Sequence, residues 1–419
     1  MKSLLRLSLV ALGLLICAFA ASPASATCGV ANGTCYMIAA GNYNNTTTVW
    51  SASSGGAACS CSPAATDGVV LDSLSGSGTL TINGTYTATF LDAKGGHSGS
   101  GTGFSGTLAL GSNTFSLVGV TGGGTGLILG LPSTMTLTGT NGINFTDAAT
   151  ETVTIDIGTA LPAITLNLGS AGTSGAGPTV FQLAGAGISN SGNSTTSVLT
   201  LTSGTLDDST NNLTVYTGSF SSSNSNTRVW NCGTGTWNFT LATGSLTTFT
   251  TSTGLTVSCA SATFNIANSS PTGRRVFSFH NPGGATSWGT INISGSATKL
   301  YDVALLSTGT QPATIANLNL TPPIAVDFTS NVTYTITNAP SWLGTVSLPI
   351  MLEGNTGSTA TTLKFGAGGA GNGTLTAVGV WNVNFTAGAS TTYGGWDFYG
   401  TSNQTFTAPA SGGGHIIGG

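Results

Sequence analysis

The stretches TWNF, TFNI, TINI and NLNL begin at Thr236, Thr263, Thr290 and Asn317, so their starting positions rise by a constant 27. Each stretch reads polar, apolar, Asn, apolar, so the four copies place the same kind of side chain at the same position. A short strand pattern that recurs at a fixed interval of about 20–50 residues is typical of repeat folds, in which each turn of chain stacks on its neighbour. The repeat therefore predicts a β-solenoid.

The repeat also separates two sets of side chains, because successive residues of a strand point to opposite faces. The apolar positions are expected to stack into a core, and they are Trp237, Phe239, Phe264, Ile266, Ile291, Ile293, Leu318 and Leu320. The polar positions are expected to form an outward ladder, and they are Thr236, Asn238, Thr263, Asn265, Thr290, Asn292 and Asn319.

The same alternation continues on both sides of the central repeat with looser spacing. TLTIN at Thr79, TLAL at Thr107 and TMTL at Thr134 precede it, and TVSL at Thr345 and TLTA at Thr374 follow it. Coils of about 27 residues that stack at about 4.8 Å bury their inward side chains in one continuous core. About a dozen such coils predict a rod roughly 60 Å long.

Composition agrees with an all-β chain of low charge. The 419 residues include 63 Gly but only 8 Lys and Arg and 12 Asp and Glu. Gly supplies the positive φ angles of tight corners, and Asn and Ser cap turns through their side chains. Beyond Ala20 there is no apolar pattern of helical period. Hydrophobic residues make up 39% of the chain and lie in register, which argues against disorder.

The N-terminal segment 1–26 has the pattern of a secretory leader. Lys2 and Arg6 form a basic start, Leu7–Ala20 is apolar apart from two positions, and an A-x-A site at 24–26 predicts cleavage between Ala26 and Thr27. This apolar run is too short to span a bilayer, and no later segment is suited to do so. The expected localisation is therefore secreted, either extracellular or at the cell surface.

Removal of the leader leaves 6 basic and 12 acidic residues, a formal net charge of −6. This balance argues against nucleic acid and anionic membrane surfaces as partners. The expected organisation is a leader at 1–26, a Cys-containing N-terminal cap at 27–76, a parallel β-helix at 77–400 and a Gly-rich tail at 401–419.

Six cysteines follow the leader, which suits an oxidising compartment. Cys232 and Cys259 are separated by the interval of the repeat, so neighbouring coils bring them to a distance that a disulfide tolerates. The other four cluster before the first coil and predict a cap held by disulfides, with three pairings open: Cys28, Cys35, Cys59 and Cys61. A zinc site is the rival interpretation, but the spacing of Cys59-x-Cys61 is wrong for it and no His is near.

Two stretches resemble a known group. Trp50–Asn83 contains SGGAACSCSPAATDGVVLDSLSGSGTLTIN, and Leu199–Arg228 reads LTLTSGTLDDSTNNLTVYTGSFSSSNSNTR. The first resembles the opening of the passenger-type right-handed β-helices of autotransporter-like adhesins and of phage-encoded solenoids, and the second resembles one of their coils. The resemblance implies an all-β, right-handed parallel β-helix. An autotransporter ends in a membrane barrel, whereas this chain stops after GGGHIIGG, so we expect a passenger-like rod without its own translocator.

No set of residues predicts an active site. Asp207-Asp208 is the only adjacent acidic pair, and its setting GTLDDST fits a turn at a coil corner equally well. Asp147, Glu151 and Asp156 lie close in sequence, but acidic residues in so poorly charged a chain are usually solvated turn residues. The Gly-His-Gly and Arg-x-Lys segments of a polygalacturonase-like site are absent.

The remaining polar candidates are isolated. His97, His280 and His415 are far apart, and Arg274-Arg275 is the only basic pair. Asp does not recur in the Gly-x-Asp register of calcium-binding repeats. The sequence therefore predicts no catalytic residue, metal ligand or cofactor.

The outward Thr and Asn ranks admit three interpretations: a solubilising ladder, a surface for ice or another crystal, or a surface for carbohydrate. The function expected from the sequence is a secreted or surface-exposed structural and adhesive rod without catalysis, with glycans or host cell-surface components as partners. The alternatives are a carbohydrate-binding or carbohydrate-cleaving β-helix and a component of a phage-type tail fibre or spike.

Overall fold

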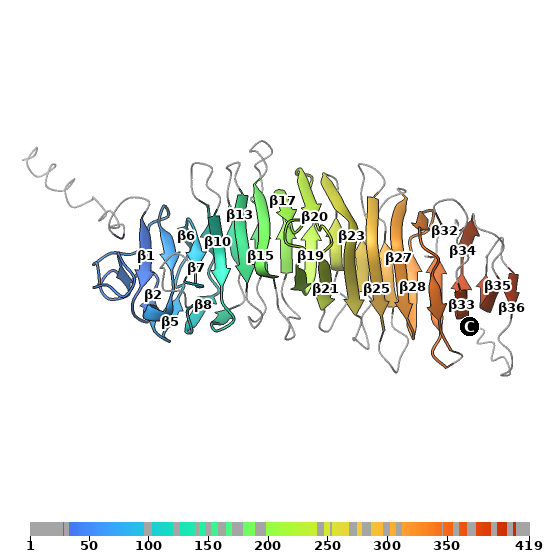
Figure 1. Cartoon of the computed structure of the whole chain (residues 1–419), viewed down its shortest axis with the longest axis horizontal. Helices are drawn as coiled ribbons and strands as arrows, with labels where there is room; N and C mark the ends of the chain where they lie inside the picture. Colours follow the sequence, from blue (N-terminus) through green and yellow to red (C-terminus); the bar gives the residue numbers. More distant parts are fainter. Residues whose placement is uncertain are drawn as a thin grey trace, which may run out of the picture.

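A computed structural model of the chain describes residues 28, 33–95, 103–119, 126–139, 142–146, 152–157, 165–169, 179–188, 198–240, 247–251, 254–267, 275–278, 286–295, 302–306, 312–345, 347–354, 360–366, 374–386, 392–399 and 405–407. Outside these ranges lie residues 1–27, most of residues 401–419, Asp147, Glu151, Arg274 and all three histidines. The described chain is elongated, and its strands follow one another along the long axis in sequence order (Figure 1).

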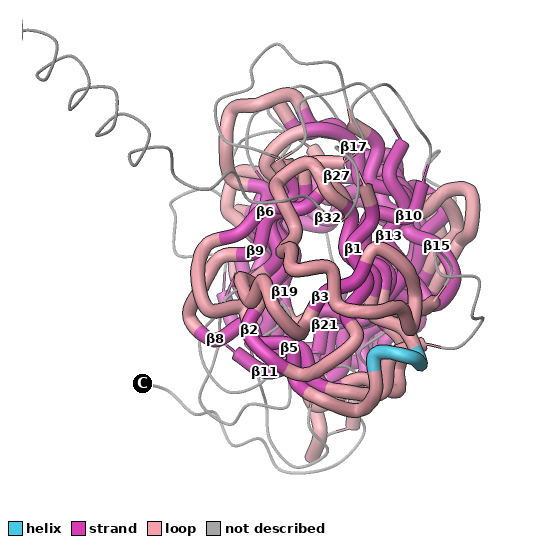
Figure 2. Tube along the Cα trace, turned by 90° about the vertical axis from the view of Figure 1, so that its left-hand side faces the viewer, coloured by secondary structure: helices cyan, strands magenta, loops and turns pink. Residues whose placement is uncertain are grey.

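The fold is all-β, with long parallel sheets that are consistent with a β-solenoid. Within the described residues, the one helical segment is the short 3-10 helix η1 (Ser73–Ser75), whose N-cap Asp72 accepts hydrogen bonds from the backbone of Leu74 and Ser75. Seen along the long axis, the strands lie behind one another around a common outline (Figure 2).

A 15-stranded sheet runs the length of the molecule, and its members pair in the order in which they occur in the chain, with β30 attached beside β33. They are β6 (Tyr86–Ala88), β9 (Phe115–Leu117), β12 (Ile143–Phe145), β14 (Thr165–Leu168), β16 (Val198–Leu201), β19 (Ser219–Ser222), β22 (Thr247–Thr251), β24 (Arg275–Ser278), β26 (Asp302–Leu306), β28 (Ile324–Phe328), β30 (Ser341–Leu343), β31 (Ile350–Gly354), β33 (Thr374–Trp381), β35 (Thr392–Tyr399) and β36 (Thr405–Thr407).

A 17-stranded sheet consists of two arms that meet in one strand. The first arm contains β1 (Thr34–Met37), β3 (Trp50–Ser51), β4 (Gly68–Val70), β7 (Leu91–Asp92), β10 (Gly126–Leu131), β13 (Thr152–Ile157), β15 (Val180–Ile188), β17 (Gly204–Asp207) and β20 (Arg228–Asn231). The second contains β18 (Thr214–Thr217) and β21 (Thr236–Thr240). Beyond the shared strand the sheet continues through β25 (Thr286–Ser294), β27 (Ala313–Thr321), β29 (Thr333–Ile336), β32 (Thr361–Phe365) and β34 (Val383–Thr386).

The shared strand is β23 (Leu255–Ala267), the longest of the described strands at 13 residues. Its beginning pairs with β20 and its end pairs with β21, so one continuous strand turns the corner between the arms. A separate 4-stranded sheet near the N-terminal end holds β2 (Gly41–Asn42), β5 (Thr79–Thr81), β8 (Thr107–Gly111) and β11 (Thr136–Gly139).

The interval between paired residues is 27 along the outward ladder of the central repeat and varies along the rest of the chain. Thr263 pairs with Thr236 on one side and with Thr290 on the other, both at this interval. Thr214 pairs with Thr236 over a shorter stretch of chain, whereas Leu91 pairs with Leu129 over a longer one. Parallel strands tolerate such differences because extra residues can lie in the loops between them. The interval of 27 predicted from the four copies therefore holds between their paired strands and is not constant along the chain.

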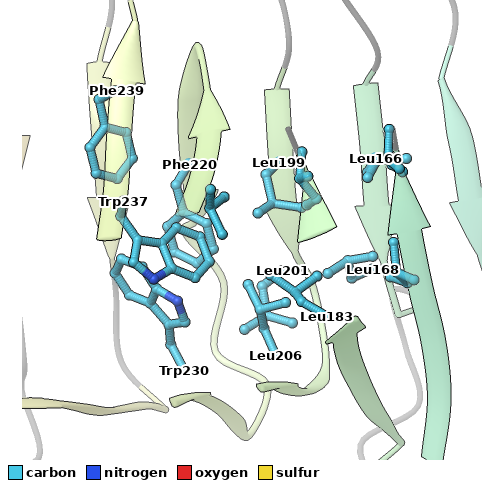
Figure 3. Packing of buried hydrophobic residues seen from close by; sticks show 14 of the residues in the cluster. Leu166, Leu168, Leu183, Leu199, Leu201, Leu206, Phe220, Trp230, Trp237 and Phe239 are labelled. Atoms are coloured by element: carbon cyan, nitrogen blue, oxygen red, sulfur yellow. The ribbon is translucent and has the colours of Figure 1, made fainter. Parts of the chain in front are cut away.

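The core lies between the sheets, where inward side chains stack from one strand to the next (Figure 3). Leu166 pairs with Leu199, which in turn pairs with Phe220. The ring of Phe220 stacks on that of Trp230 with centroids 4.6 Å apart, and Trp230 meets Trp237 edge to face at 4.8 Å. Each buried aromatic ring removes a large apolar surface from water, and such burial is the main favourable contribution to folding.

The first arm ends at its N-terminal edge in the one antiparallel pairing between described strands, that of β1 with β3. The indole nitrogen of Trp50 in β3 donates a hydrogen bond to the carbonyl oxygen of Tyr43 at 2.8 Å. The rings of these two residues pack edge to face, and both side chains are buried. An antiparallel partner at the edge covers the outer hydrogen-bonding groups of β1.

Candidate functional site

The asparagines of the repeat form a ladder of hydrogen bonds on the outward side of β21, β23, β25 and β27. Nδ2 of Asn265 donates to Oδ1 of Asn238 at 2.8 Å. Asn292 donates to Asn265 in the same way at 2.7 Å, and Asn319 donates to Asn292 at 2.7 Å. The first three amides are half-buried and the last is exposed. In-register parallel strands place identical side chains at one strand spacing, which brings each amide within reach of the next.

A second polar rank lies two positions before the ladder. Thr236, Thr263 and Thr290 are in register and half-buried, and Asn317 continues the rank. Nδ2 of Asn317 donates to Oγ1 of Thr290 at 3.0 Å. These ranks give the sheet a regular array of amide and hydroxyl groups. An Asn amide has two N–H donors and two acceptor lone pairs, so one donor and one lone pair remain after each ladder bond.

The apolar positions of the repeat lie behind the ladder in the core. All eight side chains are buried, with exposed fractions from 0% to 6%. Phe264 pairs with Trp237 on one side and with Ile291 on the other, and Ile291 pairs with Leu318. The alternation therefore separates a dry interior from a polar exterior within each strand.

A second, shorter asparagine ladder lies in the 15-stranded sheet, and the sequence analysis missed it. Nδ2 of Asn167 donates to Oδ1 of Asn144 at 2.6 Å. The two residues are in register in β14 and β12. Both sit in an apolar–Asn–apolar stretch, INF at Ile143 and LNL at Leu166. That pattern was the signal, but the interval is 23 residues, so a search at the interval of the central repeat passes over it.

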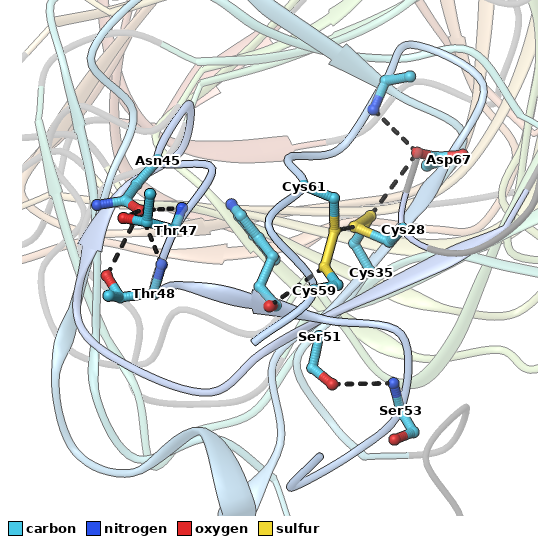
Figure 4. The surroundings of a disulfide bond; sticks show 12 residues. Cys28, Cys35, Asn45, Thr47, Thr48, Ser51, Ser53, Cys59, Cys61 and Asp67 are labelled. Atoms are coloured by element: carbon cyan, nitrogen blue, oxygen red, sulfur yellow. Dashed lines mark hydrogen bonds between the residues drawn. A yellow bond between two sulfur atoms is a disulfide. The ribbon is translucent and has the colours of Figure 1, made fainter. Parts of the chain in front are cut away.

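Disulfides join the six cysteines from Cys28 to Cys259 in three pairs. The bridge between Cys232 and Cys259 links β23 to the residue that follows its paired strand β20, with Cα atoms 4.9 Å apart and both residues fully buried. In the cap, the pairing that the sequence left open is Cys28 with Cys35 and Cys59 with Cys61. The two bridges of the cap lie against each other, since Sγ of Cys61 is 3.1 Å from Sγ of Cys28 (Figure 4).

Among the described residues, the cap also contains two groups of three side chains whose potential metal-ligand atoms lie close together. Sγ of Cys28 lies within 4.8 Å of those of Cys59 and Cys61, and also within that distance of Cys35 and of a carboxylate oxygen of Asp67. A metal binds the thiolate form of Cys. Here the sulfurs are held in disulfides instead, so the arrangement in this structure is covalent.

Asp207 and Asp208 close a turn. Asp208 is buried, and both of its carboxylate oxygens accept hydrogen bonds from the backbone nitrogen of Leu213, at 3.0 and 3.1 Å. Burial raises the pKa of Asp208 to about 6, and the charge of Asp207 adds to this effect while the hydrogen bond opposes it. Asp207 accepts from the backbone and the hydroxyl of Ser209. Each carboxylate of the pair therefore accepts hydrogen bonds from residues of the turn in which it lies.

A different acidic pair, which the sequence analysis missed, lies across two strands. Asp327 in β28 is in register with Glu353 in β31, and Glu353 is in register with Trp381 in β33. Inward positions of these strands are fully buried, whereas Trp381 is 50% exposed and Glu353 is half-buried. Asp327 is 8% exposed. This acidic row of two carboxylates and one indole thus runs along the outward side of the 15-stranded sheet.

The sequence contains a signal for the acidic row. PIAVDF begins at Pro323 and PIMLEG at Pro349, and the two stretches align without a gap. The alignment places Asp327 and Glu353 at the same position of neighbouring strands. A search for acidic residues that are adjacent in sequence cannot find such a pair, because neighbours across a solenoid are separated by a whole coil.

The other candidates are placed only in part. Asp156 forms an ion pair with Lys94, with Nζ and Oδ2 2.6 Å apart. The partly exposed Asp156 therefore has a cationic partner, whereas Asp147 and Glu151, which lie close to it in sequence, are outside the described residues. Arg275 belongs to β24, while its neighbour in the basic pair is not described. Within the described ranges, no helix has the length and hydropathy needed to span a membrane.

No protein-family model matches this chain, and neither does any curated protein or solved structure.

Proposed function

We propose that this protein is a secreted or surface-exposed structural and adhesive rod without catalysis. In this proposal the solenoid is a right-handed parallel β-helix with coils of about 27 residues and a disulfide-bonded N-terminal cap. Its partners are glycans or components of host and cell surfaces. The observation that carries the proposal is the asparagine ladder, which presents amide groups at a constant spacing across four strands.

Three properties of the molecule support this role. Amides and hydroxyls both donate and accept hydrogen bonds, which suits the hydroxyl groups of saccharides. A rank of equivalent groups makes many weak contacts at once, so binding adds up along a repetitive surface. Three disulfides favour an oxidising compartment, which agrees with the expected leader.

The test is a glycan array probed with the mature protein, together with sedimentation of the same sample. Binding is expected to weaken when Asn265→Thr and Asn292→Thr alter the ladder. A matched control carries Asn144→Thr and Asn167→Thr in the second ladder and should retain binding. If the two variants bind glycans equally, or if neither variant binds, the central ladder is not the adhesive surface and the proposal is wrong. Sedimentation as a trimer would favour the fibre alternative.

The acidic row favours a second candidate, a carbohydrate-active β-helix. Asp327 and Glu353 lie one strand spacing apart, about 4.8 Å between backbones. Retaining glycoside hydrolysis uses two carboxyl groups about 5 Å apart, and side chains at neighbouring in-register positions are close enough to reach this separation. Trp381 beside them offers an indole face for a sugar ring. Release of reducing ends from a polysaccharide panel by the wild type, abolished by Glu353→Gln, would establish this candidate in place of the first.

A further inference from the structure

The four sulfurs of the N-terminal cap form a chain of contacts that leads from the surface to the interior. Cys59 is half-buried, whereas Cys61, Cys28 and Cys35 are 2%, 3% and 0% exposed. Cys59 is bonded to Cys61, the sulfur of Cys61 touches that of Cys28 at 3.1 Å, and Cys28 is bonded to Cys35. The bridges are thus arranged in series, with one accessible end.

The buried end of the series meets a carboxylate. Oδ2 of Asp67 lies 3.7 Å from Sγ of Cys35. The side chain of Asp67 is fully buried and is held in place by the backbone nitrogens of Gly33 and Ala64, at 3.2 and 2.9 Å. A carboxylate is an acceptor, so it can receive a hydrogen bond from a thiol at Cys35 but gives nothing to a disulfide.

From this arrangement we propose that the cap is a thiol-capture site, at which an external thiol becomes covalently attached to Cys59. A thiolate attacks a disulfide at the sulfur that it can reach, and the other sulfur leaves. In the cap the reachable sulfur is Sγ of Cys59, so the incoming thiolate bonds to Cys59 and Cys61 is released as a thiolate.

The released Cys61 then has a second disulfide in contact. It attacks Sγ of Cys28, the Cys28–Cys35 bond breaks, and a Cys28–Cys61 bond forms. The sulfur of Cys35 takes up the proton that the incoming thiol lost and donates it in a hydrogen bond to Asp67. One thiol and two disulfides enter the sequence, and one thiol and two disulfides leave it, so no oxidant or reductant is required.

This second exchange makes the capture persistent. After a single exchange, the free thiol of Cys61 lies two positions from Cys59 and would expel the captured group at once, because its effective concentration is high. After the transfer to Cys28, the only free thiol is that of Cys35, which is buried. The partner class is therefore any molecule that carries an accessible thiol, such as a Cys-containing peptide or surface protein. This inference does not depend on adhesion through the ladder.

The experiment incubates the oxidised protein with glutathione, removes the excess and maps the disulfides by mass spectrometry without reduction. The expected product carries one glutathione on Cys59, a Cys28–Cys61 bond and a free Cys35. An unmodified protein, a glutathione at any other cysteine, or a Cys59 adduct with Cys28–Cys35 intact would each overturn the proposal. The assignment rests on the wild type alone, so it does not require a variant to fold.

Two double variants test the transfer step. Cys28→Ala with Cys35→Ala removes the acceptor disulfide, and about tenfold less adduct is expected to survive removal of glutathione. Cys232→Ala with Cys259→Ala removes a disulfide elsewhere and should retain as much adduct as the wild type. Circular dichroism of both variants checks that the fold is kept. Equal retention by the two variants would contradict the relay.

Discussion

Among the single residues, Asp208 makes the stability of this protein depend on pH. Its pKa is raised to about 6 by burial, from 3.8 in an unfolded chain. The folded state therefore binds more protons than the unfolded state between about pH 4 and pH 6, and stability falls as pH rises through this window. Each unit of pKa difference corresponds to about 1.4 kcal/mol.

We expect Asp208→Asn to remove this loss, because an amide keeps an acceptor for Leu213 and carries no charge. Unfolding by urea, followed from pH 3.5 to 7, should show a flatter dependence for this variant than for the wild type. Asp207→Asn is the comparison variant: it removes the neighbouring charge that contributes to the raised pKa of Asp208 but leaves the buried carboxyl in place, so it should flatten the dependence less than Asp208→Asn does. A variant curve that parallels the wild type would contradict the assignment.

Phe264 is the central ring of the repeat, and its removal should be costly. It is fully buried and packs edge to face against Trp288, with centroids 5.4 Å apart. Phe264→Ala is expected to lower the free energy of unfolding by about 3–5 kcal/mol, because the surrounding side chains close only part of the cavity. Thr263→Ala on the outward face should change it by less than about 0.5 kcal/mol. Denaturant unfolding of the two variants compares them directly.

Whether a side chain is buried could be predicted where the alternation within strands coincides with the interval of 27 residues between them. It could not be predicted where burial depends on a local contact. The inward positions from Trp237 to Leu320 are recognisable because the alternation and the constant interval coincide there. Arg228 carried no such signal. It is fully buried, its guanidinium donates to the backbone carbonyls of Ser222, Asn224 and Asn226, and burial lowers its pKa to about 10. Only the closed shape of the loop creates that site.

Between the strands, the asparagine ladder provides links as well as a polar surface. Asn292 both donates to Asn265 and accepts from Asn319. Asn292→Ala removes two hydrogen bonds and is expected to cost about 1–3 kcal/mol. Asn319→Ala removes one of these bonds at an exposed position and should cost about half as much. Thermal unfolding of the two variants measures the difference. Equal losses of stability would contradict the expectation that an amide with two ladder bonds contributes more than an amide with one.

The bridge between β23 and the residue after β20 should stabilise the centre of the molecule. It closes a loop of 27 residues, for which the chain-entropy argument gives about 3 kcal/mol. We expect Cys232→Ala with Cys259→Ala to lose about this amount under non-reducing conditions. Alanine is preferred to serine because both positions are buried. Adding a reductant should destabilise the wild type more than the variant. An equal effect on both proteins would show that the stabilisation comes from the two disulfides of the cap.

The existence of strands could be predicted from the sequence, but partners in the cap and across coils could not. Four cysteines allow three pairings, and only the fold brings Cys28 to Cys35. The acidic row escaped because Asp327 and Glu353 share a register and are not neighbours in sequence. In both cases the missing information is which residues the corners bring together, and corners depend on loop length and turn geometry, which vary along this chain.

For the molecule as a whole, we expect the N-terminal strands β1, β3 and β4 to protect one end of the 17-stranded sheet. A chain that begins at residue 77 lacks β1, β3 and β4, so the edge of β7 loses its partner β4. An uncovered parallel edge is a template for a further strand. We expect this truncated chain to self-associate in sedimentation velocity, whereas the full mature chain should remain dispersed. Cys28→Ala with Cys35→Ala keeps the strands of the cap and is the control, and a monomeric truncated chain would contradict the protective role.

The bridge between Cys232 and Cys259 has a consequence for a rod that is pulled at its ends. The strands lie across the long axis, so tension would detach one coil after another and release the contour length of each. The stretch of 27 residues from Cys232 to Cys259, fully extended, would release roughly 90 Å at about 3.4 Å per residue. The bridge withholds that length, because the chain between the two sulfurs cannot be drawn out while the bond is intact. Under tension, the disulfide at the centre of this molecule therefore limits how far the chain can extend.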